Sequence, residues 1–116
     1  MDKDIELSLL YDFYGALLSE RQKEVLGLYH EENLSLSEIA DEFGISRQAV
    51  HDALKNGQTS LLEYESKLGL VEKFTLTNNA VNEIDSRIDD MIESNECDSK
   101  IRNCLLDIKT IIDDLN

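Results

Sequence analysis

Five polar side chains lie close together between positions 46 and 55, and their types suit contact with nucleic acid. On a helix, Ser46, Arg47, Gln48, His51 and Lys55 would turn toward the same side. Arginine recognises guanine and glutamine recognises adenine through paired hydrogen bonds in the major groove of DNA. Asp52 would share this face, where its carboxylate would repel phosphate. The segment therefore predicts a helix that contacts DNA with one unfavourable charge.

The residues just before and within this segment have the spacing of a helix-turn-helix. Ala40 is small enough to let two helices approach, and Gly44 falls where the connecting turn needs a positive φ. Val50 follows Ala40 by ten residues, at the point where the second helix packs back on the first. Ile39 and Leu54 supply apolar packing between the helices. The pattern favours a helix-turn-helix over the alternative, a plain helical hairpin within a bundle.

Serine residues mark the expected helix starts. Ser37 could cap a first helix over 36–43, and Ser46 could cap a second that runs to about Asn56. Gly57 offers a weak break, because glycine inside a helix costs about 1 kcal/mol. The sequence leaves open whether the second helix stops there or continues to Leu68, where Gly69 is a suitable C-cap.

Two further amphipathic helices precede this motif. Apolar residues recur at helical spacing from Ile5 to Leu18, and Ser19 with Gln22 matches a capping box that opens the next helix. We expect the aromatic side chains here to lie in the core rather than to form a stacking surface; they are Tyr11, Phe13, Tyr14 and Tyr29. With the motif, these elements make residues 1–70 a helix-turn-helix domain.

Residues 71–116 have the pattern of an acidic helical hairpin. Thr77 could cap one helix, and a second follows the polar segment 94–96. Two apolar stripes repeat at intervals of three and four; their members are Val81, Ile84, Ile88 and Met91, then Ile101, Cys104, Leu105, Ile108, Ile111, Ile112 and Leu115. Such stripes must be buried. The sequence leaves open whether the hairpin closes its own seam or forms a homodimer.

Composition predicts an all-α protein without a cofactor. Proline is absent and glycine numbers five, so turn signals for a β-sandwich or barrel are missing. His30 and His51 stand apart, and Cys97 and Cys104 are too far apart on a helix to be bridged, so we expect small buried thiols and no metal. No motif for a catalytic nucleophile or a phosphate-binding loop occurs, so we expect no enzymatic activity. The acidic N-terminus and the lack of a long apolar run predict a cytoplasmic protein without membrane insertion.

The net charge opposes the DNA hypothesis. The formal charge is -14, and between Leu36 and Leu70 three cations stand against six carboxylates. Specific DNA-binding proteins often neutralise about 6 to 10 phosphates. This charge therefore predicts weak DNA binding at most, and it suits contact with a basic protein better.

The order of helices resembles region 4 of bacterial sigma factors, and several segments closely resemble the YlxM family of helix-turn-helix proteins. These segments are Tyr11 to Ser19, Leu34 to Phe43, Ser46 to Val50 and Tyr64 to Leu68. The resemblance implies a sigma region 4-like bundle in a small bacterial protein encoded beside the signal recognition particle GTPase. Where the family usually has a basic pair, this chain has Lys55-Asn56.

Two functions follow as hypotheses. In the first, the chain is a non-enzymatic accessory or regulator of the signal recognition particle pathway, in contact with its GTPase or ribonucleoprotein. In the second, it is a DNA-binding transcriptional regulator that uses Arg47, Gln48, His51 and Lys55. A third possibility is that the motif serves only as a scaffold.

Overall fold

The computed structural model describes residues 3–94 and 97–115, and every regular element in these ranges is helical. The elements, in order, are α1 (Lys3–Tyr14), a short 3-10 helix η1 (Gly15–Leu17), α2 (Glu20–His30), α3 (Leu36–Phe43), α4 (Arg47–Leu68), α5 (Leu70–Glu93) and α6 (Ser99–Asp113). The chain divides into two compact units, residues 1–71 and 72–116. The all-α prediction is confirmed.

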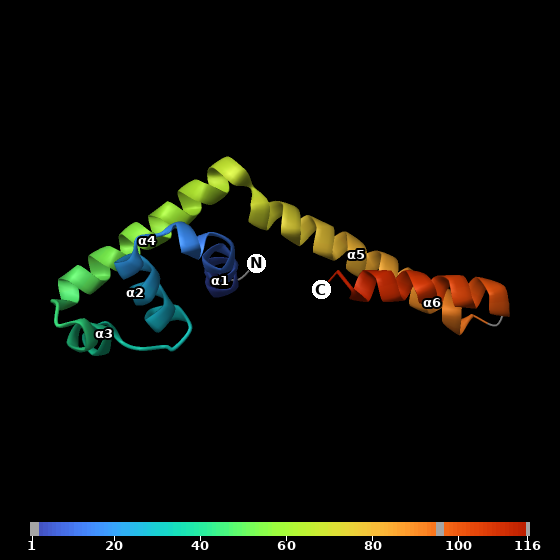
Figure 1. Cartoon of the computed structure of the whole chain (residues 1–116), viewed down its shortest axis with the longest axis horizontal. Helices are drawn as coiled ribbons and strands as arrows, with labels where there is room; N and C mark the ends of the chain where they lie inside the picture. Colours follow the sequence, from blue (N-terminus) through green and yellow to red (C-terminus); the bar gives the residue numbers. More distant parts are fainter. Residues whose placement is uncertain (1–2, 95–96, 116) are drawn as a thin grey trace. The chain divides into compact units, whose positions relative to one another are not determined.

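In the first unit, α4 is the longest helix, and α1, α2 and α3 all pack against it (Figure 1). The core is aliphatic apart from Tyr14. Its most deeply buried members come from all four helices; they are Leu10, Tyr14, Val25, Leu26, Ile39, Val50 and Leu61. Because each helix contributes one apolar stripe, the four form a single core that fixes the helix-turn-helix in place.

The helix starts of the first unit follow the capping rules, with one correction to the sequence prediction. Ser35, not Ser37, caps α3: its hydroxyl accepts from the Glu38 amide, and Glu38 accepts from the Ser35 amide in return. Ser37 lies inside the first turn. Ser35 and Ser37 are both possible caps by residue type, but only Ser35 lies three residues before Glu38, as the reciprocal bonds of a capping box require. Ser19 and Ser46 cap α2 and α4 as predicted.

Gly57 does not interrupt α4, which continues unbroken from Arg47 to Leu68. The residue is buried where α2 crosses: a Cβ placed on Gly57 would lie 2.7 Å from Cδ1 of Leu26. The absence of a side chain at Gly57 therefore allows α2 and α4 to pack closely, and the residue does not form a turn. Gly69, with φ 62°, ends the helix as predicted.

The second unit contains most of α5, together with α6, which lies alongside it (Figure 1). Thr77 is inside α5 and caps nothing, since this helix begins already at Leu70. The side chain of Asp98 caps α6 by accepting from the Ile101 amide. Part of the turn predicted at 94–96 lies outside the described residues.

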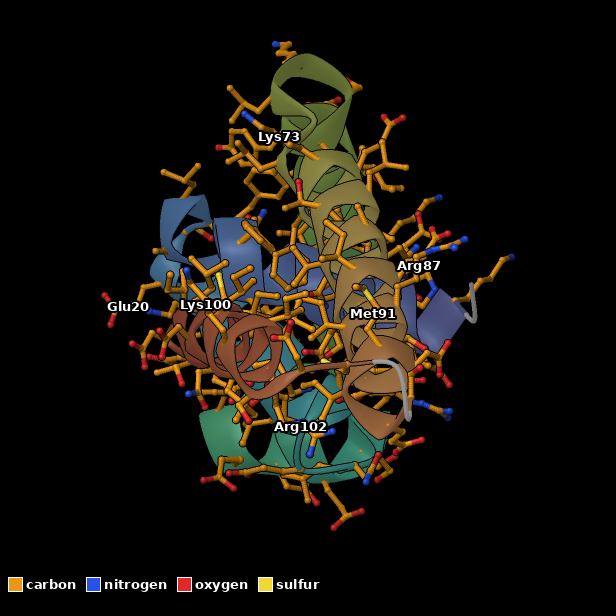
Figure 2. The ribbon with its side chains drawn as sticks, turned by 90° about the vertical axis from the view of Figure 1, so that its right-hand side faces the viewer. Glu20, Lys73, Arg87, Met91, Lys100 and Arg102 are labelled. Carbon is orange, nitrogen blue, oxygen red and sulfur yellow. The ribbon has the colours of Figure 1, made fainter. Side chains whose placement is uncertain are left out.

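Lys109 holds the two helices of this hairpin together. Its ammonium group donates to Asp85 Oδ1 at 2.9 Å and to Asp89 Oδ1 at 2.7 Å. These hydrogen bonds raise the pKa of the Lys109 ammonium above its usual range. Outside this cluster most side chains of the hairpin are exposed, and Arg87 and Arg102 extend away from the ribbon (Figure 2).

The apolar stripes of the hairpin are only partly covered. Of the described residues in 72–115, Ile88 alone is buried, while Ile84, Met91 and Ile111 are at least half exposed. Cys104 is also exposed and Cys97 is half-buried, so the expectation of two buried thiols is wrong for Cys104. The homodimer suggested by these stripes stays a prediction.

Candidate interaction face of the helix-turn-helix

The turn between α3 and α4 is built by the backbone of Gly44. Gly44 has φ 65°, and its amide donates to the Ala40 carbonyl, which also accepts from Ile45 at 3.1 Å. The bond from Ile45 is the six-residue closure of a Schellman motif and the bond from Gly44 is that of an αL cap; together they satisfy the otherwise unpaired carbonyl of Ala40. The chain can then turn at once into the Ser46 cap of α4.

The residues expected to pack the motif lie between the two helices. Ile39 and Val50 are fully buried, and Ala40 and Leu54 are nearly so. Gly44 is exposed, and a Cβ there would meet no atom within 4 Å. Four of the five residues thus contribute burial, whereas Gly44 contributes only its backbone conformation.

The five residues expected to contact nucleic acid are all exposed on the first turns of α4. The Ser46 hydroxyl accepts from the Ala49 amide at 3.0 Å and so serves as the helix cap. Arg47 and Lys55 extend into solvent with no ion pair recorded among the described residues, and His51 is more than half exposed. The structure therefore brings the five residues to one end of one helix.

Asp52 changes the chemistry of this face. The Gln48 amide nitrogen donates to Asp52 Oδ1 at 3.0 Å, and His51 Nδ1 lies 3.7 Å from the same oxygen. One of the two candidate base readers is thus already hydrogen-bonded to a carboxylate. Asp52 is expected on this face from the sequence, and its bond to Gln48 could have been predicted from their spacing of four residues on a helix.

The nearby cations add little to this face. Arg21 lies over the ring of Phe43, 4.9 Å from its centroid, in a cation–π contact. Lys23 is exposed on α2 among glutamates, in the lining of a groove beside Phe43. His30, at the end of α2, lies 3.2 Å from the amide nitrogen of Gln58. Arg47 and Lys55 are therefore the main positive charges available at the start of α4.

The described residues hold no group of three or more His, Cys, Asp or Glu side chains placed to bind a metal ion. Within the same part of the chain, no helix has the length and apolar character needed to cross a membrane.

Comparison with known proteins identifies the family of this chain. Residues 1–103 match a family model described as UPF0122, "Putative helix-turn-helix protein, YlxM / p13 like". The chain belongs to this family. Among its relatives, a UPF0122 protein of Thermoanaerobacter sp. is 40% identical over 117 residues, which covers 100% of this chain and 99% of the relative. A UPF0122 protein of Desulforamulus reducens is 46% identical over 84 residues, 72% of each chain. One from Acetivibrio thermocellus is 51% identical over 84 residues, also 72% of each chain.

The YlxM/p13-like match includes the whole helix-turn-helix unit and all of α5. The family is described by its helix-turn-helix and not by a reaction, so it is not an enzyme class. The motif identified from Ala40, Gly44 and Val50 is therefore a family feature.

Proposed function

We propose that this chain is a cytoplasmic, non-enzymatic regulatory protein that acts in the signal recognition particle pathway by protein contact. The bond between Gln48 and Asp52 is the observation that carries this proposal. The bond occupies a candidate base-reading side chain, and the Asp52 carboxylate places a negative charge on the surface that would face DNA phosphates. A helix-turn-helix with this face is poorly suited to reading a duplex, which favours protein contact through other, acidic surfaces of the chain.

The charge of the whole first unit supports the same function. Residues 1–71 carry fourteen carboxylates and six Lys or Arg side chains. Phosphate contacts supply most of the free energy of non-specific DNA binding, and a surface with this excess of negative charge repels the DNA backbone. A basic protein is attracted by the same charges. The resemblance of the chain to the YlxM family, whose members are encoded beside the targeting GTPase, supplies the pathway.

A DNA-binding transcriptional regulator is the second candidate. It is favoured by the joint exposure of Arg47, His51 and Lys55 on the first turns of α4, where a recognition helix contacts base edges. In that function Gln48 would have to exchange its bond with Asp52 for one with adenine.

Affinity capture of the tagged full chain from its host's lysate, with and without nuclease, separates the two functions. The protein-contact function predicts that the targeting GTPase is retained after nuclease treatment. It also predicts equal retention by Arg47→Glu/Lys55→Glu and by a control pair with the same charge change away from the face, Lys67→Glu/Lys73→Glu. Capture of a discrete DNA segment that nuclease removes, and that only the first variant loses, would support the DNA-binding function instead.

A further inference from the structure

A groove of about 560 Å³ lies on the first unit beside α2, Tyr11 of α1 and the C-terminal end of α3. Its half-buried floor is formed by Tyr11, Leu28 and Phe43, which also pack against the core. Five exposed glutamates surround this floor; they are Glu20, Glu24, Glu31, Glu32 and Glu42. We refer to these eight residues as the acidic groove. None of the residues of α4 that were expected to contact nucleic acid lines this groove.

The spacing of residues on α2 explains how the groove forms. Glu20, Glu24, Leu28 and Glu31 follow one another at intervals of four, four and three, so they share one face of the helix. Glu20 opens this row and projects away from the ribbon (Figure 2). From Glu20 to Glu31 the face extends for about 16 Å, the length of three helical turns.

The floor is held in place before any partner arrives. The Tyr11 hydroxyl donates to the Lys23 carbonyl at 3.1 Å. Gly27 makes room for it, since a Cβ on Gly27 would lie 3.1 Å from the Tyr11 hydroxyl oxygen. At the other side, Phe43 is fixed by its contact with Arg21. A preformed apolar floor reduces the ordering cost of binding.

The groove is strongly negative. Its described lining has five carboxylates and a single cation, Lys23. The pKa of the Tyr11 phenol is raised by burial and by the negative charges of Glu31 and Asp12. Negative charge around an apolar concave floor attracts cations and concentrates them there.

We propose that the acidic groove binds a basic amphipathic helical segment of a partner protein. Apolar side chains of that segment would lie on Tyr11, Leu28 and Phe43, and its Lys and Arg side chains would pair with the surrounding glutamates. The inference rests on the proposed function, action by protein contact, and identifies the surface and the class of partner.

Charge excludes the other occupants of this surface. Nucleic acid and anionic lipid are repelled by the five carboxylates. A second copy of the chain carries a net charge of -14 and is repelled as well. A basic amphipathic protein segment matches both the apolar floor and the surrounding charge.

The direct test is a titration of the full chain with a synthetic amphipathic peptide of about 18 residues, made of Leu and Lys at helical spacing. Binding is measured by fluorescence anisotropy at physiological ionic strength, and amide chemical shifts locate the site. We expect saturable binding with the largest shifts at Tyr11, Gly27 and Leu28.

A matched pair of variants separates the groove from the general charge of the protein. Glu24→Lys/Glu31→Lys should weaken peptide binding by about tenfold or more, because two groove carboxylates become repulsive. Glu63→Lys/Asp90→Lys makes the same change in net charge at exposed positions outside the groove and should stay within about twofold of the wild type. All four positions are exposed, and circular dichroism checks that both variants are folded.

Equal weakening of peptide binding by the two variants, or chemical-shift changes mainly outside the groove, would overturn the inference.

Capture from lysate then distinguishes a failure of the groove inference from a failure of the proposed function. If Glu24→Lys/Glu31→Lys still retains the targeting GTPase after nuclease treatment, the groove inference fails and protein contact stands. If the wild-type chain retains no protein, the proposed function fails, while the peptide titration still decides whether the groove binds basic helices.

Discussion

The Tyr14 hydroxyl donates a hydrogen bond to Oε1 of Glu65, 2.5 Å away, across 51 positions of sequence. The same hydroxyl accepts from the Leu70 amide at 3.1 Å, and Oε1 of Glu65 accepts from the Val71 amide at 3.0 Å. These bonds satisfy two of the first amides of α5, which have no partner within their own helix. One buried tyrosine thus connects α1, the end of α4 and the start of α5.

We predict that Tyr14→Phe destabilises the first unit. The variant removes a buried donor and the acceptor for Leu70, so we expect Tm to fall by about 4–8 °C. Tyr64→Phe is the control, because its hydroxyl makes a single 3.3 Å bond to the Leu17 carbonyl at an exposed site. Intrinsic tyrosine fluorescence follows unfolding of this unit, since all four tyrosines of the chain lie within residues 1–71. Equal Tm losses in the two variants would show that the buried hydrogen bonds of the Tyr14 hydroxyl stabilise the unit no more than the exposed bond of Tyr64 does.

Tyr14 also predicts a loss of stability at alkaline pH. Burial, and next the hydrogen bond to Glu65, raise the pKa of its phenol above the usual value of 10. Because the unfolded chain releases this proton at lower pH than the folded chain, the stabilisation is complete below pH 10 and is lost as pH rises through the raised value. Urea unfolding at a series of pH values should show this decline, and Tyr14→Phe should remove part of the slope. An unchanged slope in the variant would assign the decline to other groups, such as Tyr11 or Lys109.

The turn of the helix-turn-helix depends on the backbone of Gly44. Ala at this position must adopt φ 65° without gaining or losing any side-chain contact, so the expected loss is about 1–2 kcal/mol of unfolding free energy. Gly44→Asn should lose less, because asparagine tolerates the left-handed region better. Urea unfolding measures both. If Gly44→Ala were as stable as the wild type, the turn would not require the left-handed conformation.

Gly57 tests close packing between α2 and α4. Ala is favoured over Gly in a helix by about 1 kcal/mol. Overpacking against Leu26 should outweigh this gain, for a net loss of about 1 kcal/mol in Gly57→Ala.

A double-mutant cycle checks the cause. Leu26→Val shortens the side chain that the new Cβ would meet, so the double variant should be more stable than the sum of the single changes predicts. A gain of stability in Gly57→Ala alone would show that helix propensity decides at this site.

Much of the fold could be predicted because local rules and burial agree in the first unit. The apolar stripes, Ser19, Ser46, Gly44 and Gly69 each marked their element correctly. The errors had two causes, a tertiary contact at Gly57 and competing local signals at Ser37 and Thr77. Gly57 resembles a break until Leu26 is placed beside it. Ser37 resembles the cap of α3 until the reciprocal bond between Ser35 and Glu38 is considered, and Thr77 resembles a cap although the preceding residues already form helix.

The candidate site was predictable only where it depends on spacing within one helix. The exposure of Arg47 and Lys55 follows from helical periodicity alone. The acidic groove was missed, because it joins Tyr11, α2 and Phe43 from three helices and no spacing within one helix reveals it. The Tyr14–Glu65 bond was missed likewise, since it joins positions far apart in the sequence.

Action by protein contact is tested most directly by isothermal titration calorimetry between the purified full chain and its host's purified targeting GTPase, free of RNA. Action by protein contact predicts saturable binding that weakens with salt and that Arg47→Glu/Lys55→Glu leaves unchanged. Action by protein contact would be contradicted if the GTPase did not bind while a host DNA duplex did, and if the same variant abolished that DNA binding.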